Sequence, residues 1–236
     1  MRDFLVTYLS PKLKLEENTT VNLDNSMSAA TINALIAAQP KDLNGYILTF
    51  QFADGTYTLD ETLDFSGFRG DGELKVFGNS SDNTLATSKS VNLDFSGTDG
   101  LNGIEAYNNS AAIYVYYIRA TVGCTSSHAY GFSYVSCTDA RSFANSAFTS
   151  GTTYGRGFYA ARGTALHSEK DATTEFQIAW YLSMQSHCYL RDNGRGGTLP
   201  VYGYYANAGS RVGRYGTAPS ASGAQYVENS GAKITS

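Results

Sequence analysis

The sequence predicts an all-β solenoid, in which successive turns of the chain stack on one another behind a single short helix. The chain has 236 residues, of which only 16% are charged, while 24 are glycine and 18 are tyrosine. An average globular protein has roughly 25% charged residues, so this composition favours strands and tight turns. Strand-like segments recur through the C-terminal half, and only one stretch has a clean helical period.

The predicted helix spans residues 28–39. Three apolar residues in this segment have the i, i+3 and i+4 spacing that forms one face of a helix. Ser26 or Ser28 is suited to cap the first turn, and Pro40 ends the helix because proline cannot donate the next backbone hydrogen bond. The apolar face consists of Ile32, Leu35 and Ile36.

A solenoid exposes unpaired backbone groups at each end, and such edges invite aggregation. We therefore expect the helix to cover the first open end of the core. The segment GYILTFQFADGTYTL at 45–59 follows the helix and is typical of a strand, an Asp-Gly turn and a second strand, so it is expected to be the first turn beneath the cap. Residues 1–27 are expected to form an extended attachment segment, and residues 28–236 one domain with its capping helix.

The strongest internal signal is repetition. The pentapeptide LDFSG occurs at 63–67 and again at 93–97, which predicts that Asp64 and Asp94 stack on adjacent turns. Six similar segments fill the C-terminal half, and their starts lie 21 to 28 residues apart. A β-propeller is the structural alternative, but its blades need about 40 residues. The six segments are 103–115, 131–143, 157–168, 179–190, 203–215 and 224–236.

Aligning these segments gives columns of residues that should share one face of a sheet. Strand side chains alternate between faces, so the second and fourth positions point one way and the third points the other. The second and fourth columns are the more apolar, and we expect them inside. The second column comprises Ile104, Phe132, Phe158, Trp180, Tyr204 and Gln225. The third column becomes an outward ladder whose tyrosines are Tyr159, Tyr181, Tyr205 and Tyr226.

Two further tyrosines, Tyr114 and Tyr116, lie opposite Ile113 and Val115 in the alternation, so they are also expected to point outward. Aromatic faces stack on sugar rings and the phenol adds hydrogen bonds, so both tyrosine groups are candidates for ligand contact. They have two alternative roles, which are to stabilise an exposed sheet or to pack against neighbouring copies in a trimer. The alternative roles are the preferred interpretation.

Two classes of function stay open, which are binding without chemistry and cleavage of a polysaccharide. Hydrolysis of a glycosidic bond needs two carboxyl groups about 5–5.5 Å or about 6.5–9.5 Å apart. A lyase needs a base and a cation. Asp64 and Asp94 are the catalytic candidates, but a structural place beside turns explains them as well and is preferred. The segment RDNGRGGT at 191–198 is expected to be a cationic loop between turns.

Charge and motif content exclude several other functions. The net charge of −4 and the lack of a basic block disfavour a nucleic-acid partner. No apolar run of 18 residues and no conventional signal peptide occur, so neither membrane insertion nor a disulfide framework is expected. The three histidines lack metal-ligand spacing and no nucleotide-binding loop is present, so no metal and no cofactor are expected. Buried free thiols are expected at Cys124, Cys137 and Cys188.

The segment ATINALIAAQPKDLNGYILTFQFADGTYTLDETLDFSGFRGDGELKVFGN at 30–79 resembles the first part of right-handed parallel β-helix proteins of the pectin-lyase-like class. It is most similar to those of phage and prophage tail fibres. The shared elements are the capping helix, a linker with Leu-Asn-Gly, a strand, ADGTY, SGF and a glycine-rich turn. The C-terminal repeats GYYANAGSRVGRYGTAPS and GAQYVENSGAKITS resemble the ends of such fibres, so the resemblance extends from about 30 to 236.

This resemblance implies a right-handed parallel β-helix and a tail-fibre-like virion protein, made in the bacterial cytoplasm, that adsorbs to the host surface or decorates the tail. It implies a homotrimer, contacts with other tail or virion proteins, and binding of host-surface glycan or protein. A tailspike-like polysaccharide depolymerase of the same fold, a hydrolase or a lyase, is the alternative. Only about 25 residues precede the cap and no long shaft is encoded, so another protein is expected to hold this one.

Overall fold

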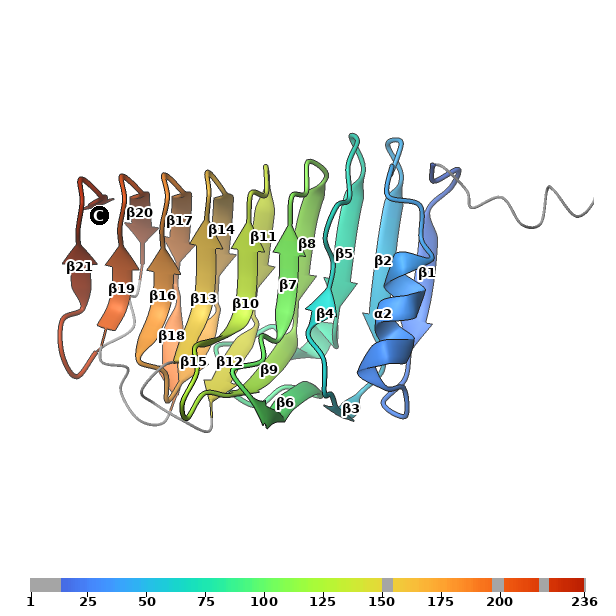
Figure 1. The fold of residues 1–236 in the computed structure, drawn as a ribbon, viewed down its shortest axis with the longest axis horizontal. Helices are drawn as coiled ribbons and strands as arrows, with labels where there is room; N and C mark the ends of the chain where they lie inside the picture. Colours follow the sequence, from blue (N-terminus) through green and yellow to red (C-terminus); the bar gives the residue numbers. More distant parts are fainter. Residues whose placement is uncertain (1–13, 150–154, 197–201, 217–220, 236) are drawn as a thin grey trace, which may run out of the picture.

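The computed structural model describes residues 14–149, 155–196, 202–216 and 221–235, and this part of the chain winds into a parallel β-helix with three sheets (Figure 1). From β2 to β19 each turn adds one strand to each sheet, and every strand pair within the sheets is parallel. The all-β class and the β-helix architecture are therefore confirmed. The first half of the expected attachment segment, residues 1–13, lies outside the described residues.

The three sheets have nine, seven and six strands. The nine-stranded sheet contains, in spatial order, β1 (Thr19–Leu23), β2 (Ile47–Phe52), β5 (Glu73–Phe77), β8 (Ala112–Tyr116), β11 (Ala140–Phe143), β14 (Ala165–Glu169), β17 (His187–Arg191), β20 (Arg211–Tyr215) and β22 (Lys233–Thr235). The seven-stranded sheet contains β21 (Tyr226–Glu228), β19 (Tyr202–Ala206), β16 (Ile178–Leu182), β13 (Gly155–Ala161), β10 (Ala129–Val135), β7 (Ile104–Tyr107) and β4 (Leu63–Asp64). The six-stranded sheet contains β18 (Gly194–Gly196), β15 (Ala172–Thr174), β12 (Ser146–Thr149), β9 (Ile118–Gly123), β6 (Val91–Asp99) and β3 (Gly55–Thr58).

The predicted helix is α2 (Ala29–Ala37), and it lies at the N-terminal end of the β-helix (Figure 1). The side chain of Ser28 caps it by accepting the backbone N–H of Thr31. Ile32 and Ile36 are buried in the core, and Leu35 packs against the core while partly exposed. A short 3₁₀ helix, η1 (Ser80–Asp82), is the other helical element among the described residues.

The helix covers the free edge of β4, which is the outermost strand of the seven-stranded sheet. The Asn33 side chain donates to the carbonyl oxygen of Thr62 at 2.9 Å and accepts the backbone N–H of Asp64 at 3.1 Å. The expectation that α2 protects an open end is thus confirmed at the level of hydrogen bonds. The nine-stranded sheet extends one strand further, because β1 pairs with β2. The segment at 45–59 is therefore not the outermost turn of that sheet.

Stacked aromatic rings fill the core behind the seven-stranded sheet. Phe132 stacks on Phe158 at 5.0 Å between ring centroids, Phe158 on Trp180 at 5.2 Å, and Trp180 contacts Tyr204 edge-on at 5.4 Å. Ile104 pairs with Phe132, so the inward second column is confirmed for its first five members.

The last turn departs from the predicted register. Tyr226, and not Gln225, pairs with Tyr204, and the two rings stack at 5.8 Å. The expected place of Tyr226 in the outward ladder is therefore wrong, and Val227 pairs with Tyr205 instead. A slip of one residue moves every side chain of a strand to the other face. The sequence alignment started each segment at its first small residue and so missed this slip. The register of β21 is set instead by the stacking of Tyr226 on Tyr204.

A repeated corner joins the nine-stranded and six-stranded sheets. Its first residue has positive φ in successive turns, 51° at Ala144, 54° at Lys170 and 49° at Asp192. In the two later turns this corner directly follows β14 and β17. After the corner that begins at Asp192, strand β18 begins at Gly194. The prediction that 191–198 is a loop is therefore wrong for Arg191, which ends β17, and for the part that forms β18. The end of that segment, from residue 197 on, lies outside the described residues.

The second residue of each of these corners points into the core, and on successive turns these residues form a ladder of hydrogen bonds. The side-chain oxygen Oδ1 accepts the backbone N–H of the preceding turn at three levels, at 2.9, 2.8 and 3.0 Å. The members, Asn145, Asp171 and Asn193, are fully buried. The ladder pairs backbone groups that the corners leave outside the sheets, which stabilises the stacking of turns.

Cys124, Cys137 and Cys188 are buried free cysteines, as expected. Burial raises the pKa of the Cys137 thiol to about 11 and that of Cys188 well above its ordinary value. Both thiols therefore stay protonated and act as small apolar side chains. No helix in the described part of the chain has both the length and the apolar character needed to span a bilayer.

Candidate functional site

The two copies of LDFSG lie on different sheets. Asp64 is in β4 of the seven-stranded sheet, whereas Asp94 is in β6 of the six-stranded sheet, so the prediction that they stack is wrong. In both copies the carboxylate accepts the N–H of the serine two residues later, at 3.0 Å to Ser66 and 3.0 Å to Ser96. The repeat thus encodes the same local hydrogen bond in two different sheets. Its offset of 30 residues is shorter than the path from β4 to the next strand of its own sheet, β7.

The residue that the structure pairs with Asp64 is Glu105 on β7. Burial raises the pKa of Glu105, and the nearby negative charge of Asp64 raises it further. Lys41 and Asp64 line a hollow of about 390 Å³, and Lys41 donates to the carbonyl oxygen of Ser66 at 3.0 Å. Burial lowers the pKa of Lys41 while the Asp64 charge opposes that shift. The sequence pattern placed Glu105 on the outer face but did not reveal this carboxyl pair.

The outer face of the seven-stranded sheet carries the expected tyrosine ladder, in part. Tyr159 stacks on Tyr181 at 5.5 Å and 12°, and Tyr181 lies against Tyr205 at 5.2 Å and 38°. A residue that the sequence pattern missed, Tyr130, extends the ladder by stacking on Tyr159 at 4.5 Å and 20°. Tyr130 belongs to a neighbouring column, in which it pairs with Arg156, Arg156 with Ile178 and Ile178 with Tyr202, so no tyrosine pattern across successive turns marked it.

Contacts within the ladder occupy most of the ring faces. The guanidinium group of Arg156 lies 4.3 Å from the ring centroid of Tyr181 and donates to the Tyr130 hydroxyl at 2.8 Å. Burial raises the pKa of the Tyr159 hydroxyl. Sugars stack on aromatic faces, so rings that already cover one another favour a role in stabilising the sheet. Ligand contact by Tyr159, Tyr181 or Tyr205 is the less favoured interpretation on this geometry.

Tyr114 and Tyr116 alternate along β8 with Ile113 and Val115, which are fully buried, as predicted. Tyr114 is nevertheless only 8% exposed, because the Arg141 guanidinium lies 4.8 Å from its ring centroid. Tyr116 lies in a packed aromatic cluster, and burial raises its pKa to about 12. Its ring partners, at 4.9 to 5.8 Å, are Phe77, Tyr117 and Phe143. Most of this cluster is therefore committed to packing on the outer face of the nine-stranded sheet.

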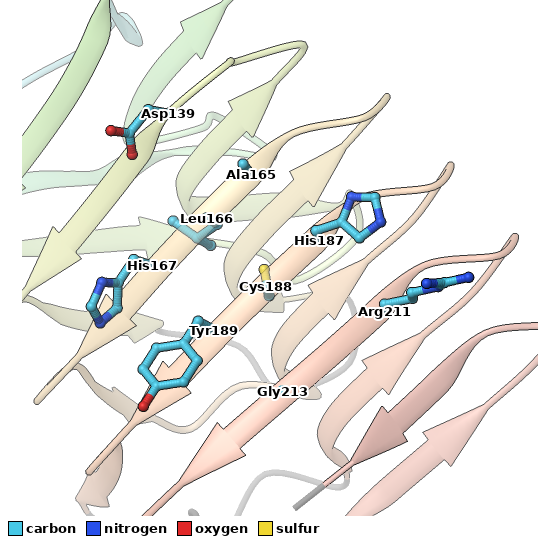
Figure 2. A pocket seen from close by; sticks show the side chains of 9 residues that line it. All are labelled: Asp139, Ala165, Leu166, His167, His187, Cys188, Tyr189, Arg211 and Gly213. Atoms are coloured by element: carbon cyan, nitrogen blue, oxygen red, sulfur yellow. The ribbon is translucent and has the colours of Figure 1, made fainter.

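Three adjoining hollows follow the same outer face toward the C-terminal turns. The first, of about 390 Å³, is lined by His167, His187, Tyr189, Arg211 and Gly213 among others (Figure 2). The second, of about 130 Å³, shares His167 with the first, and the third, of about 460 Å³, shares Arg211 and Gly213 with it. The hollows form a row along the axis of the β-helix, which we call the outer row.

One column of side chains runs through the outer row. Arg141, His167, Tyr189, Gly213 and Thr235 occupy equivalent places on successive strands from β11 to β22. The Tyr189 ring meets His167 edge-on at 5.0 Å and 84°, and its side chain is 44% exposed. On the other side of Tyr189 the column has no side chain, because the next residue is glycine.

Neither the backbone nor the packing requires glycine at this place. Gly213 is absent from the positive-φ glycines, and a Cβ built there would lie 3.8 Å from the Tyr189 Cδ2 atom, an ordinary contact. Glycine inside a strand costs about 0.5–1 kcal/mol relative to alanine. The glycine thus leaves the sheet surface beside Tyr189 unfilled, at some cost in stability. None of the outer-row residues except Tyr116 was a predicted site residue.

Most of the charged groups near the centre of the outer row are paired. Arg141 contacts Asp139 at 3.4 Å, and Glu169 lies 3.7 Å from both Arg191 and His167. Burial lowers the pKa of His167, an effect that the Glu169 charge partly opposes, so the imidazole is mainly neutral at pH 7. Within the ranges that the structure describes, no three histidine, cysteine, aspartate or glutamate side chains are arranged to hold a metal ion.

Comparisons of the chain with protein-family models, with curated proteins and with solved structures found no match in any of the three.

Proposed function

We propose that this protein binds a glycan without cleaving it, through the outer row on the nine-stranded sheet. The observation that carries this proposal is the exposed ring of Tyr189 beside the unfilled place at Gly213. A sugar ring packs its C–H face on an aromatic side chain and directs its hydroxyl groups to polar neighbours. Because Gly213 has no side chain, the sheet surface there leaves room for such a ring to lie against Tyr189.

The neighbours of Tyr189 supply the polar groups that a sugar needs. His167 and Glu169 lie on one side and Arg211 on the other, and each lines one or two of the hollows. These groups project from strands of one continuous parallel sheet, so their spacing is set before a ligand arrives. A preformed surface loses little conformational entropy on binding.

The biological setting that we propose is a tail-fibre-like component of a phage or prophage virion, which adsorbs to the host surface or decorates the tail. Its support is the resemblance of residues 30–79 and of the last repeats to tail-fibre β-helices. In this setting the protein is a homotrimer held by other tail proteins. The tyrosine ladder of Tyr159, Tyr181 and Tyr205 offers a flat aromatic surface for packing between copies.

A depolymerase on the same fold is the second candidate. The observation that favours it is the pairing of Asp64 with Glu105, because a carboxyl group of raised pKa beside a second carboxyl group is the arrangement of a glycosidase. The pair lies on the seven-stranded sheet at the N-terminal end, away from the outer row. Asp64→Asn should abolish any release of short saccharides if this pair is catalytic.

Incubation with immobilised capsule and lipopolysaccharide from candidate hosts tests the proposal. Retention of the protein without release of short saccharides supports binding, and release supports the depolymerase. Tyr189→Ala should remove retention, whereas Tyr46→Ala, a control at an exposed tyrosine near the other end, should not. If Tyr181→Ala removes retention and Tyr189→Ala does not, the ladder is the binding surface and the outer row is not.

A further inference from the structure

We infer that the glycan bound in the outer row is acidic, and that its carboxylate or phosphate groups are held by a column of three basic side chains. The column consists of His187, Arg211 and Lys233, which we call the basic column. This inference rests on the proposed function, because it names the chemical class of the ligand for the same surface.

The basic column is set by the register of the last strands of the nine-stranded sheet. His187 on β17 pairs with Arg211 on β20, and Arg211 pairs with Lys233 on β22. All three side chains are exposed. Neighbouring strands lie about 4.8 Å apart, and like charges directly opposite one another destabilise a sheet. The positive charges of Arg211 and Lys233 therefore repel one another unless an anion lies between them, and His187 continues the column on the neighbouring turn.

The basic column differs from the other basic residues of this face by the lack of acidic partners. Arg141 is paired with Asp139 and Arg191 with Glu169. In the described ranges no ion pair and no side-chain hydrogen bond involves the three residues of the basic column. The whole chain has a net charge of −4, so this basic surface is a local feature and not a property of the composition.

The basic column borders the place proposed for the sugar ring. Arg211 lines the first and third hollows together with Gly213, and Lys233 lines the third. Figure 2 shows His187 and Arg211 near the starts of their strands, with Tyr189 and Gly213 two residues further along. A sugar that packs on Tyr189 over Gly213 thus has its acidic substituent within reach of Arg211. Charge-assisted hydrogen bonds from arginine to carboxylate or phosphate are the strong ones of their kind.

The column also runs along the axis of the β-helix, with one basic side chain on each successive turn. A polymer that lies along this axis presents its own acidic groups in series. The geometry therefore fits an acidic polysaccharide better than a single small anion. Because the contacts are exposed charges, their contribution should weaken as salt screens them.

The test compares one set of bacterial capsular and lipopolysaccharides in three forms: native, with carboxyl groups reduced to alcohols, and with phosphate groups removed. The affinity of the full chain for each form is measured at two salt concentrations. The native form should bind at least tenfold more tightly than the form that lacks the recognised anion. Whichever treatment weakens binding identifies the anion as a carboxylate or a phosphate.

Two pairs of variants separate recognition from folding. Arg211→Gln should weaken binding to the native form at least tenfold and leave binding to the neutral form unchanged, whereas Arg69→Gln, a control at an exposed arginine of the N-terminal end, should change neither. Gly213→Leu should remove binding to every form while thermal unfolding shifts no more than in Gly97→Leu. A Cβ at Gly97 of β6 meets open space, and one at Gly213 makes only ordinary contacts, the nearest with Tyr189 at 3.8 Å.

Each outcome decides a different claim. Equal binding of native and neutral forms, or an unchanged affinity in Arg211→Gln, overturns the acidic ligand and leaves the proposed function standing. No binding of any form overturns both. A loss of affinity in Arg69→Gln equal to that in Arg211→Gln would show attraction to charge at any place on the surface, and it also overturns the basic column.

Discussion

Replacing Asp171 with asparagine tests the energetic cost of a buried carboxyl group in the ladder between turns. Asp171 is fully buried, and burial raises its pKa to about 7. Its Oδ1 atom accepts the backbone N–H of Asn145 at 2.8 Å, and its Oδ2 atom accepts the hydroxyl of Ser168 at 2.6 Å. These bonds and the charge of Lys89 favour the carboxylate, but desolvation is the larger effect.

The magnitude follows from the two pKa values. The carboxyl group titrates at 3.8 in the unfolded chain and at about 7 in the folded one, a difference of about 4 kcal/mol at about 1.36 kcal/mol per unit. The folded state binds the proton more tightly, so this contribution to stability is fully present below about pH 4. It is lost as the pH rises to about 7. Asparagine has no such titration.

Asparagine also introduces a cost that does not depend on pH. Ser168 Oγ already accepts hydrogen bonds from Trp180 Nε1 at 3.1 Å and from Asn193 Nδ2 at 3.1 Å. The new amide N–H group beside Ser168 therefore finds no free acceptor, at a cost of about 1–3 kcal/mol. We expect Asp171→Asn to be less stable than the wild type at pH 4 and more stable at pH 8, with the two curves crossing between them.

Urea unfolding followed by the fluorescence of Trp180, the single tryptophan, measures both curves from pH 4 to pH 8. Asp60→Asn, at an exposed turn, serves as the control and should run parallel to the wild type. Parallel curves for Asp171→Asn and the wild type over this range would refute the reasoning, because they would mean that the buried carboxyl group has the same pKa in both states.

Three further changes test the packing of the turns. Ala144→Gly should raise the unfolding free energy by up to about 1 kcal/mol, because φ is 51° there, whereas Ala147→Gly in β12 should lower it; chemical denaturation distinguishes them. Asn33→Ala should cost about 1–3 kcal/mol and promote aggregation, seen by light scattering, because β4 loses two hydrogen bonds. Tyr159→Ala should cost about 1–3 kcal/mol in urea and Tyr159→Phe much less, since the ring stacks on two neighbours.

The fold was predictable because stacking imposes the same demand on each turn. An inward place such as Phe158 contacts the same place in the turns before and after it, so aromatic residues recur and the period becomes visible in a single sequence. The helix was predictable for a similar reason, since Ile32 and Ile36 must both face the core. The first residues of the corners carried no comparable signal, because Ala144, Lys170 and Asp192 share a backbone conformation and no side-chain chemistry.

The main error was the prediction that Asp64 and Asp94 stack, and it arose because the LDFSG sequence repeats in segments that do not stack in space. In both LDFSG copies the aspartate carboxylate accepts the serine N–H, so their similarity reflects a shared local hydrogen bond and not a shared sheet. Sequence identity at a fixed offset cannot separate these cases when the length of a turn varies along the chain. The predicted register of the last strand was wrong for a similar reason. The contact between Tyr226 and Tyr204 sets that register, whereas the small residue at the start of the segment has no influence on it.

The outer row could not be read from the sequence for a different physical reason. A search for chemistry-bearing residues finds tyrosines, and it favoured Tyr159 and Tyr181, whose faces the structure shows covering one another. At Tyr189 the decisive feature is a missing side chain, and a glycine among 24 carries no such meaning until the register places it beside an exposed ring. Because Gly213 is required by neither its φ nor its packing, its substitution separates a binding role from a structural one. If Gly213→Leu changed neither the stability nor the glycan retention, the hollow beside Tyr189 would have no role in binding.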